Sequence, residues 1–245
     1  MKQPTVNKEH EKLYSKYLAA LVRFYGRISL GDAFAIIQKQ NKEKYDFLEF
    51  VIFARKEAEG KSKHQENGEF YILYQSEVFY GENDENPSAM EVINQCFLDL
   101  DEDYYELEAI ADDYPFYIPQ KQELLRYADD NYTKETPALR RLAEWVLRHQ
   151  RKDLPFELAA EDVYSEAVMS SQMFSDYMLV LSQLSRWIDL SRSKQERDKQ
   201  LDELINLLTE VHNTTRQWHL NGHTPKEIEA LLKNHTLHDV ESYYL

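Results

Sequence analysis

The spacing of apolar residues changes once along this chain, and that change limits the folds the chain can adopt. Residues 9–25, 29–41 and 43–58 place apolar side chains three and four positions apart, which is the period of an amphipathic helix. Ser29 can cap the second of these helices, with Asp32 three positions later. Residues 70–74 and 77–80 are instead short runs of aromatic and β-branched side chains. Such runs favour strands, so we expect three helices followed by an antiparallel hairpin.

Three helices and then a hairpin is the element order of a winged helix, in which a helix-turn-helix carries a β-hairpin. We therefore predict a winged-helix-like module over residues 1–85. The pair Asn86 and Pro87 is typical of a helix start, with asparagine as the cap and proline in the first turn. We expect that helix to begin an acidic helical connector, residues 86–113. Its apolar side chains would be Met90, Ile93, Phe97 and Leu100.

The remaining residues, 114–245, carry helix signals almost throughout and are predicted to form a multi-helix array. Helices are expected from Thr136, over residues 158–170 and over residues 174–190. The whole chain has only six Gly and seven Pro, which favours helices because helix interiors exclude both residues. The predicted fold class is therefore mainly α, with one small β-hairpin in the N-terminal module.

The clearest helix signal begins at Ser193. Ser193 and Glu196 have the spacing of a capping box, and apolar residues then recur every three or four positions until Gly222. A helix of that length would extend about 40 Å. Thr224 and Glu227 repeat the capping-box spacing and predict a new helix directly afterwards.

Charge is sorted by position along the chain. Residues 1–63 carry 13 Lys and Arg against 8 Asp and Glu, whereas residues 64–113 carry 15 acids and no Lys or Arg. The formal net charge of the chain is −15. Such asymmetry concerns partners rather than fold, and it restricts a contact with nucleic acid or with an acidic partner to the N-terminal module. The basic residues singled out for that contact are Lys42, Lys44, Arg55, Lys56, Lys61 and Lys63.

A DNA-binding regulator acting through residues 1–63 is the weakest of three functional hypotheses. The start of the third helix mixes Lys42 and Lys44 with acidic neighbours. The hairpin beside it carries Glu69 and Glu77, which would repel phosphate.

The most distinctive segment of the sequence is residues 211–227, VHNTTRQWHLNGHTPKE. On a continuous helix, His212, Arg216 and His219 would share one face. Arg216 could then bind a phosphate, or it could hold the carbonyls of the helix end and the following turn. We favour the second interpretation, a helix–turn–helix corner with Trp218 in the core. The candidate binding residues of this corner are His212, Asn213, Arg216 and His219.

An enzymatic alternative uses the same corner. Arg216 and His223, with six residues between them, loosely fit the Arg-plus-His spacing of the HEPN domains, a family of helical ribonucleases. In that reading both residues would be catalytic and would line an open groove.

Three segments carry a resemblance to a known group of proteins. They are LVRFYGRIS at residues 21–29, FYIPQKQELLRYAD at residues 116–129, and the 211–227 block. Together they resemble a family of uncharacterised helical proteins from low-GC Gram-positive bacteria. Some members end in the SecA-type C-terminal zinc motif, which this sequence lacks. The resemblance implies a helical fold and a bacterial source, and it implies no catalytic activity.

Motifs for cofactors and metals are missing from the sequence. The six glycines are isolated, so no phosphate-binding loop can be built from them. The alternating acids Asp99, Asp101 and Asp103 lack the glycine and glutamate of a calcium loop, and the single Cys96 cannot form an internal disulfide or a thiolate zinc site. We therefore expect no cofactor and no metal.

The chain start has no secretory signal, and residues 167–185 are too polar to cross a membrane, so we expect a cytoplasmic protein without membrane contact. Taken together, these observations favour a non-enzymatic regulatory or adaptor protein whose partner is another protein. The sequence predicts no particular oligomeric state.

Overall fold

The computed structural model describes most of the chain as two compact units. The first contains residues 1–113 and 117–132, and the second contains residues 114–116 and 133–245. The expected break at residue 85 therefore falls inside the first unit. No helix in the described residues is long and apolar enough to cross a membrane. The described residues are 6–61, 71–74, 86–94, 111, 114–129, 131–172 and 182–233.

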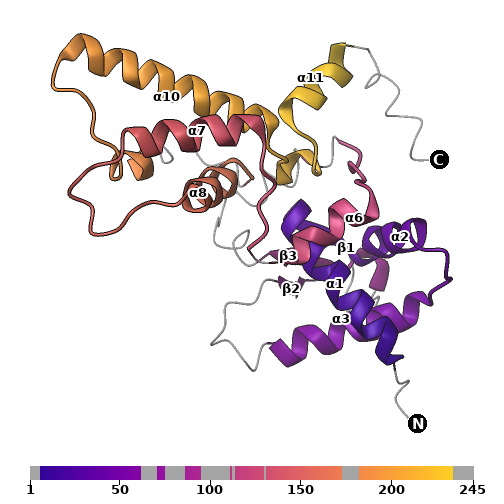
Figure 1. The fold of residues 1–245 in the computed structure, drawn as a ribbon. Coiled ribbons are helices and arrows are strands. Elements are labelled where there is room, and N and C mark those ends of the chain that lie inside the picture. The colour runs from indigo at the N-terminus through magenta and orange to yellow at the C-terminus, as the bar shows by residue number, and fades with distance from the viewer. Residues whose placement is uncertain are drawn as a thin grey trace. The chain divides into compact units, whose positions relative to one another are not determined.

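The first unit has the topology of a winged helix (Figure 1). A small antiparallel sheet joins the three strands in the order β1-β3-β2, so β3 lies in the centre and pairs with both others. Helix, strand, two helices and two further strands follow each other along the chain. These elements are α1 (Lys8–Tyr25), β1 (Arg27–Ser29), α2 (Leu30–Gln40), α3 (Phe47–Lys61), β2 (Tyr71–Tyr74) and β3 (Glu91–Asn94).

Capping residues set the ends of the first two helices. The Asn7 side chain accepts a hydrogen bond from the Glu9 amide at 3.0 Å and begins α1. Gly26 ends α1 with a φ of 76°, a conformation that glycine adopts without a Cβ penalty. Ser29 then caps α2 by accepting from the Asp32 amide at 3.0 Å, which confirms the predicted cap.

Helix α3 begins later than predicted. Residues 43–46 are not helical, and the first helical residue is Phe47. The physical reason is Asp46, whose carboxylate accepts the Glu49 amide at 2.9 Å and so acts as the N-terminal cap. The fully buried rings of Tyr14 on α1 and Phe50 on α3 meet with their centroids 5.2 Å apart in the core.

The central strand corrects a prediction. Residues 91–94 form β3 rather than a helix, and Asn86 caps only a single 3-10 turn, η2 (Pro87–Ala89). Val92 and Ile93 are both fully buried, as β-branched residues in a central strand often are. The strand predicted over residues 70–74 is confirmed at residues 71–74, but its antiparallel partner among the described residues is β3. The predicted pairing with residues 77–80 is not tested, because those residues lie outside the described part of the chain, as do Phe97 and Leu100.

A later segment completes the first unit. The short helices α6 (Lys121–Leu124) and η3 (Leu125–Ala128) pack along α1. The Tyr25 hydroxyl donates to the Tyr117 carbonyl at 2.7 Å, and the Gln40 amide donates to the Pro119 carbonyl at 2.8 Å. Arg23 on α1 also donates to the Tyr127 carbonyl.

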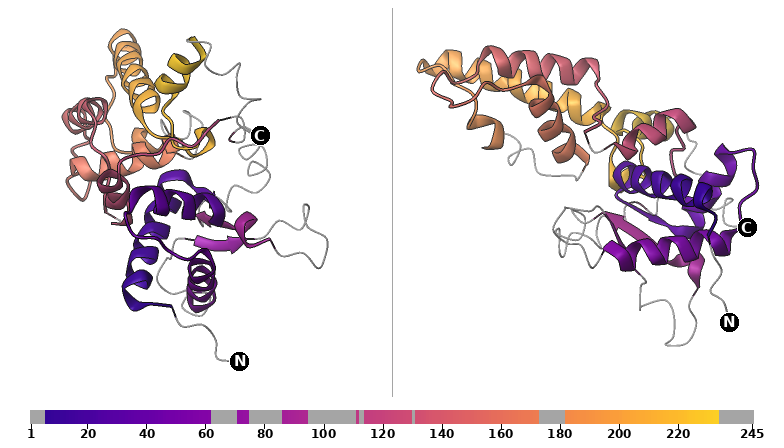
Figure 2. Two further views of the ribbon diagram at one scale, coloured as in Figure 1. Left: turned by 90° about the vertical axis from the view of Figure 1, so that its right-hand side faces the viewer. Right: turned by 60° about the horizontal axis from the view of Figure 1, so that its bottom comes forward.

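The second unit is helical. Helices α7, α8 and α10 pack against one another around a core that includes Leu142, Val163 and Leu208 (Figure 2, right). The predicted helices starting at Thr136 and near residue 158 are confirmed. The elements of this unit are α7 (Pro137–Arg148), α8 (Ala160–Gln172), α10 (Lys194–Thr214), η4 (Trp218–Leu220) and α11 (Pro225–Lys233).

Two helix ends in this unit were predicted too far along the chain. The helix expected over residues 174–190 has left the helical conformation by Trp187, and Ile188 pairs with Gln150 in an isolated bridge. Residues 173–181 of that helix lie outside the described residues.

Helix α10 ends at Thr214 instead of Gly222, so it extends about 30 Å. The hydroxyls of Thr214 and Thr215 bond to carbonyls of the preceding turn, which competes with continuation of the helix. The Ser193 side chain makes no capping bond, so the predicted capping box at the start of α10 is not formed.

Candidate functional site

The turn between α10 and α11 contains mostly polar side chains, yet residues 215–224 are all buried. Arg216 is only 9% exposed. Its Nη1 donates to the Gly222 carbonyl at 3.1 Å and to the Glu227 carboxylate. This is the carbonyl-and-carboxylate environment expected of a structural tie across the corner.

Glu227 links that tie to the next helix. Its carboxylate accepts the Thr224 amide at 2.9 Å while the Thr224 hydroxyl accepts the Glu227 amide, so the predicted capping box at the start of α11 is formed. Burial of the carboxylate opposes its ionisation. The hydrogen bonds from Thr224 and Arg216 outweigh burial and hold the pKa of Glu227 below its ordinary value.

His223 and Asn221 attach a distant piece of chain to the same corner. His223 Nε2 lies 3.0 Å from the Pro115 carbonyl oxygen, and the Asn221 side-chain amide donates to the Tyr114 carbonyl at 2.7 Å. Burial lowers the pKa of His223 although the Pro115 carbonyl partly offsets it. A general acid or base works best with a pKa near the working pH, so this shift is unfavourable for catalysis.

The other two histidines of the corner are also neutral at pH 7. Burial lowers the pKa of His212, which lies 3.2 Å from the Gln217 side-chain nitrogen. Burial, and then the neighbouring His212, lower the pKa of His219 to about 4. Neutral histidines can bind metals, but no group of three or more His, Cys, Asp or Glu in the described part of the chain is placed to hold an ion.

The structure brings Arg216 and His223 into one corner, where both form hydrogen bonds to groups of the second unit. Because α10 ends at Thr214, His212, Arg216 and His219 do not share a helical face as predicted. Asn213 is half-buried in the last turn of α10, and Trp218 is buried as expected. The geometry favours the structural interpretation of the corner over the catalytic pair.

The basic residues predicted for an N-terminal contact are dispersed. Lys42 and Lys44 are exposed in the loop between α2 and α3, which also exposes Glu43 and Asp46. Two basic residues of α3 have partners within the unit. The Arg55 guanidinium lies 3.4 Å from the Met90 sulfur, and the Lys56 ammonium pairs with Glu11 at 2.9 Å. Lys61 ends α3, and Lys63 lies outside the described residues.

Two aliphatic side chains lie on the outer face of α3, next to the exposed Lys56. Leu48 is 61% exposed, and Ile52, four positions later and therefore on the same face, is half-buried. In a helix-turn-helix unit the second helix of the motif is the one that enters the DNA groove. The sequence contained a signal for this exposed apolar position. Leu48 is apolar, but it does not follow the spacing of three and four residues that relates the buried residues of α3.

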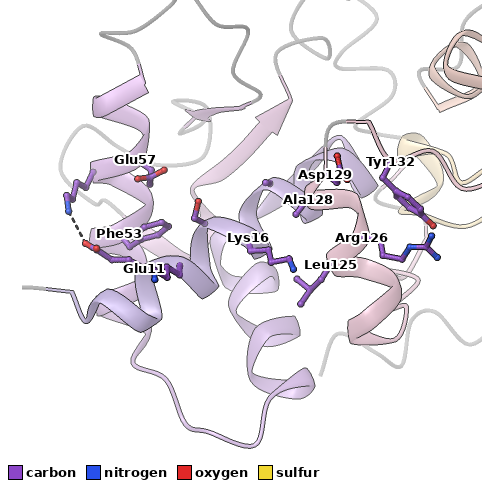
Figure 3. A pocket seen from close by; sticks show the side chains of 13 residues that line it. Glu11, Lys16, Phe53, Glu57, Leu125, Arg126, Ala128, Asp129 and Tyr132 are labelled. Carbon is purple, nitrogen blue, oxygen red and sulfur yellow. Dashed lines mark hydrogen bonds and ion pairs between the residues drawn. The ribbon is translucent and has the colours of Figure 1, made fainter. Parts of the chain in front are cut away.

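A groove of about 920 Å³ lies within the first unit, between α1, α3 and the segment around η3 (Figure 3). Lys12 and Lys16 line it from α1, and Phe53 and Lys56 from α3. The opposite side is formed by Leu125, Arg126, Ala128, Asp129 and Tyr132. Sequence reasoning missed this groove, since it depends on a segment more than a hundred residues away from α1.

A second cluster joins the starts of α1 and α3. His10 Nδ1 lies 2.7 Å from a Glu49 carboxylate oxygen, and the other Glu49 oxygen accepts the Asn7 amide at 2.8 Å. The Tyr14 hydroxyl donates to Glu49 at 3.3 Å, and the Tyr45 ring packs edge-on against His10. The hydrogen bond to Glu49 raises the pKa of His10.

No protein-family model, no curated protein sequence and no solved structure matches this chain.

Proposed function

We propose that this chain is a non-enzymatic regulatory or adaptor protein, and that it binds another protein through the outer face of α3. The observation that carries the proposal is the exposed Leu48 together with Ile52. A helix that contacts duplex DNA presents cations and hydrogen-bonding groups to phosphates and base edges. Aliphatic side chains in that position are better suited to the apolar centre of a protein interface.

The placement of charge supports a protein partner over DNA. Lys56 is paired with Glu11, and Arg55 lies against Met90, so the two best-placed cations of α3 already have partners inside the unit. Lys42 and Lys44 lie beside acids of the same loop. Binding of DNA gains its free energy largely from cations that neutralise phosphates, and few are left on this helix for that purpose.

The C-terminal corner supports a non-enzymatic role in the same way. Arg216 and His223 are both bonded to groups of their own unit, and the pKa of His223 is lowered. We keep the resemblance to helical proteins of low-GC Gram-positive bacteria as part of the proposal, because it agrees with the helical fold and brings no activity of its own.

Photo-cross-linking in cells tests the proposal. A photoreactive phenylalanine analogue replaces Leu48, and the same analogue at the exposed Ala35 on α2 serves as the control. We expect a protein adduct from position 48 that is weak or missing from position 35. It should also disappear when Ile52→Glu is introduced. An adduct to nucleic acid at position 48 would favour the DNA-binding alternative instead.

A further inference from the structure

The groove of the first unit combines cations with apolar surface. Lys12 and Lys16 are exposed on α1, one helical turn apart, so their ammonium groups emerge along the same side. Leu125 and Tyr132 contribute apolar surface on the opposite side, and Figure 3 shows Lys16 extending from α1 toward Leu125.

Several of these cations are not neutralised by the groove itself. Lys56 pairs with Glu11, but in the part of the chain that the structure describes neither Lys12 nor Lys16 forms an ion pair. The Arg126 guanidinium lies over the Tyr132 ring, 4.4 Å from its centroid, and both residues line the groove. The lining therefore carries four cations, Lys12, Lys16, Lys56 and Arg126, against three acids, Glu11, Glu57 and Asp129. This is a small net positive charge in a chain whose net charge is −15.

We propose that the groove binds an acidic segment of a partner protein. Carboxylates of the segment would pair with Lys12, Lys16 and Arg126, while an apolar side chain would pack on Leu125. This inference rests on the proposed adaptor function, and it adds the chemistry of the partner and a second contact surface.

A peptide fits the groove better than a nucleic acid does. Glu57 and Asp129 also line the groove, and a continuous phosphate backbone would bring negative charge against them. A peptide can place its carboxylates at separated positions and leave neutral side chains beside these two acids. Such a segment would be drawn in by the cations, with an affinity that falls as salt rises.

The test uses the full chain and fluorescein-labelled decapeptides in which Glu alternates with Leu, Phe, Tyr or Ala. Matched peptides carry Gln in place of Glu, and a ten-nucleotide oligo-dT is the nucleic-acid probe. Fluorescence anisotropy should show saturable binding of at least one Glu peptide below about 1 mM, with weaker binding at high salt and little binding of its Gln counterpart.

Paired variants locate the binding. Lys12→Gln with Lys16→Gln should weaken binding of the Glu peptide by about tenfold or more, with an unchanged melting temperature because both side chains are exposed. Lys194→Gln with Lys199→Gln makes the same charge change at two exposed positions of α10, away from the groove lining, and should have little effect.

Three results would overturn the groove proposal. The first is a failure of the Glu peptides, which either do not saturate or bind no better than the Gln peptides. The second is equal loss of binding in the two paired variants. The third is stronger binding of oligo-dT than of the Glu peptides at the groove. These results leave the proposed function untouched, because its test is the photo-cross-linked protein adduct at position 48. If that adduct is missing while the Glu peptides bind, the proposed contact through α3 is wrong and the groove proposal stands.

Discussion

Arg216 is held by partners that a surface residue would not need. It donates to the Gly222 carbonyl and to Glu227, which itself caps α11, so its guanidinium joins the turn after α10 to the start of α11. The sequence pointed to this residue and to its structural role, because an arginine near a glycine-ended helix and a capping box has suitable partners on both sides. The contact of His223 with Pro115 could not be predicted, since it joins residues 108 positions apart.

Arg216→Ala should destabilise the protein by roughly 1–3 kcal/mol, because it strands a buried carbonyl and a carboxylate. Arg148→Ala, which removes an exposed arginine at the end of α7, is the matched control and should change the free energy of unfolding very little. Urea denaturation measures both. A ribonuclease reading would instead require Arg216→Ala to keep its stability while an RNA-cleaving activity of the wild-type protein disappears.

His10 should make stability depend on pH. Its pKa is raised by the hydrogen bond to Glu49, so the folded state binds the proton more tightly than the unfolded chain, whose ordinary value is 6.5. The stabilisation is then complete below about pH 6.5 and is lost as the pH rises through the higher folded value. Because the side chain is 19% exposed and the pair is partly screened, we expect a contribution of about 1 kcal/mol or less.

The measurement compares the wild-type protein with His10→Gln at pH 5.5 and pH 8.5. The difference in free energy of unfolding between the two proteins should be larger at pH 5.5. Equal differences at both values would show that the charge of His10 does not stabilise the link between α1 and α3.

At the scale of elements, local signals were predicted well and long-range pairing was not. Caps at Ser29, Thr136 and Thr224 lie where the sequence placed them, because each cap depends on residues only three positions away. Strand β3 was mistaken for a helix, since Asn86 and Pro87 do begin a helical turn and the strand pairing needs partners more than sixty positions earlier. Strand β1 was missed because only three residues form it, which is too short a run to give a strand pattern.

Gly31 at the start of α2 shows how closely the 86–90 segment approaches. A Cβ at this position would lie 3.0 Å from the Ser88 carbonyl oxygen, and the Leu30 amide donates to the Met90 carbonyl at 2.7 Å. Gly31→Ala gains about 1 kcal/mol of helix propensity. The backbone clash should cost about 1–3 kcal/mol and outweigh that gain.

Thermal unfolding tests this balance, with Ala33→Gly as a contrasting change in the same helix. A lower melting temperature for Gly31→Ala is the expected result. A higher melting temperature would mean that residues 86–90 move away from α2 at little cost. Their contact with α2 would then not determine where the chain enters β3.

At the scale of the whole molecule, the first unit needs more of the chain than the sequence suggested. Strands β1 and β2 pair only through β3 among the described residues, and residues 117–129 cover α1. The sequence divided the chain into residues 1–85, 86–113 and 114–245, and it did not foresee the crossing in which residues 114–116 belong to the second unit and residues 117–132 to the first.

Fragments of the chain should reflect this organisation. Residues 1–132 should unfold in one cooperative transition, because all the described elements of the first unit are present. Residues 1–82 lack β3 and the cover of α1, so they should have no cooperative transition and should be degraded quickly by protease. Circular dichroism on heating distinguishes the two. Cooperative unfolding of residues 1–82 would mean that β3 is dispensable for the unit.

The central claim is that a winged-helix topology serves here for binding protein rather than DNA, and duplex binding by the full chain tests it most directly. Fluorescence anisotropy with a labelled random-sequence duplex should show weak binding at about 50 mM salt and none at about 150 mM, since the net charge is −15 and Arg55 and Lys56 of α3 have internal partners. Leu48→Lys with Ile52→Lys should strengthen the binding at low salt by adding cations to the outer face. Tight binding by the wild-type chain that changes little between the two salt concentrations would contradict the claim and identify α3 as a specific reader of DNA.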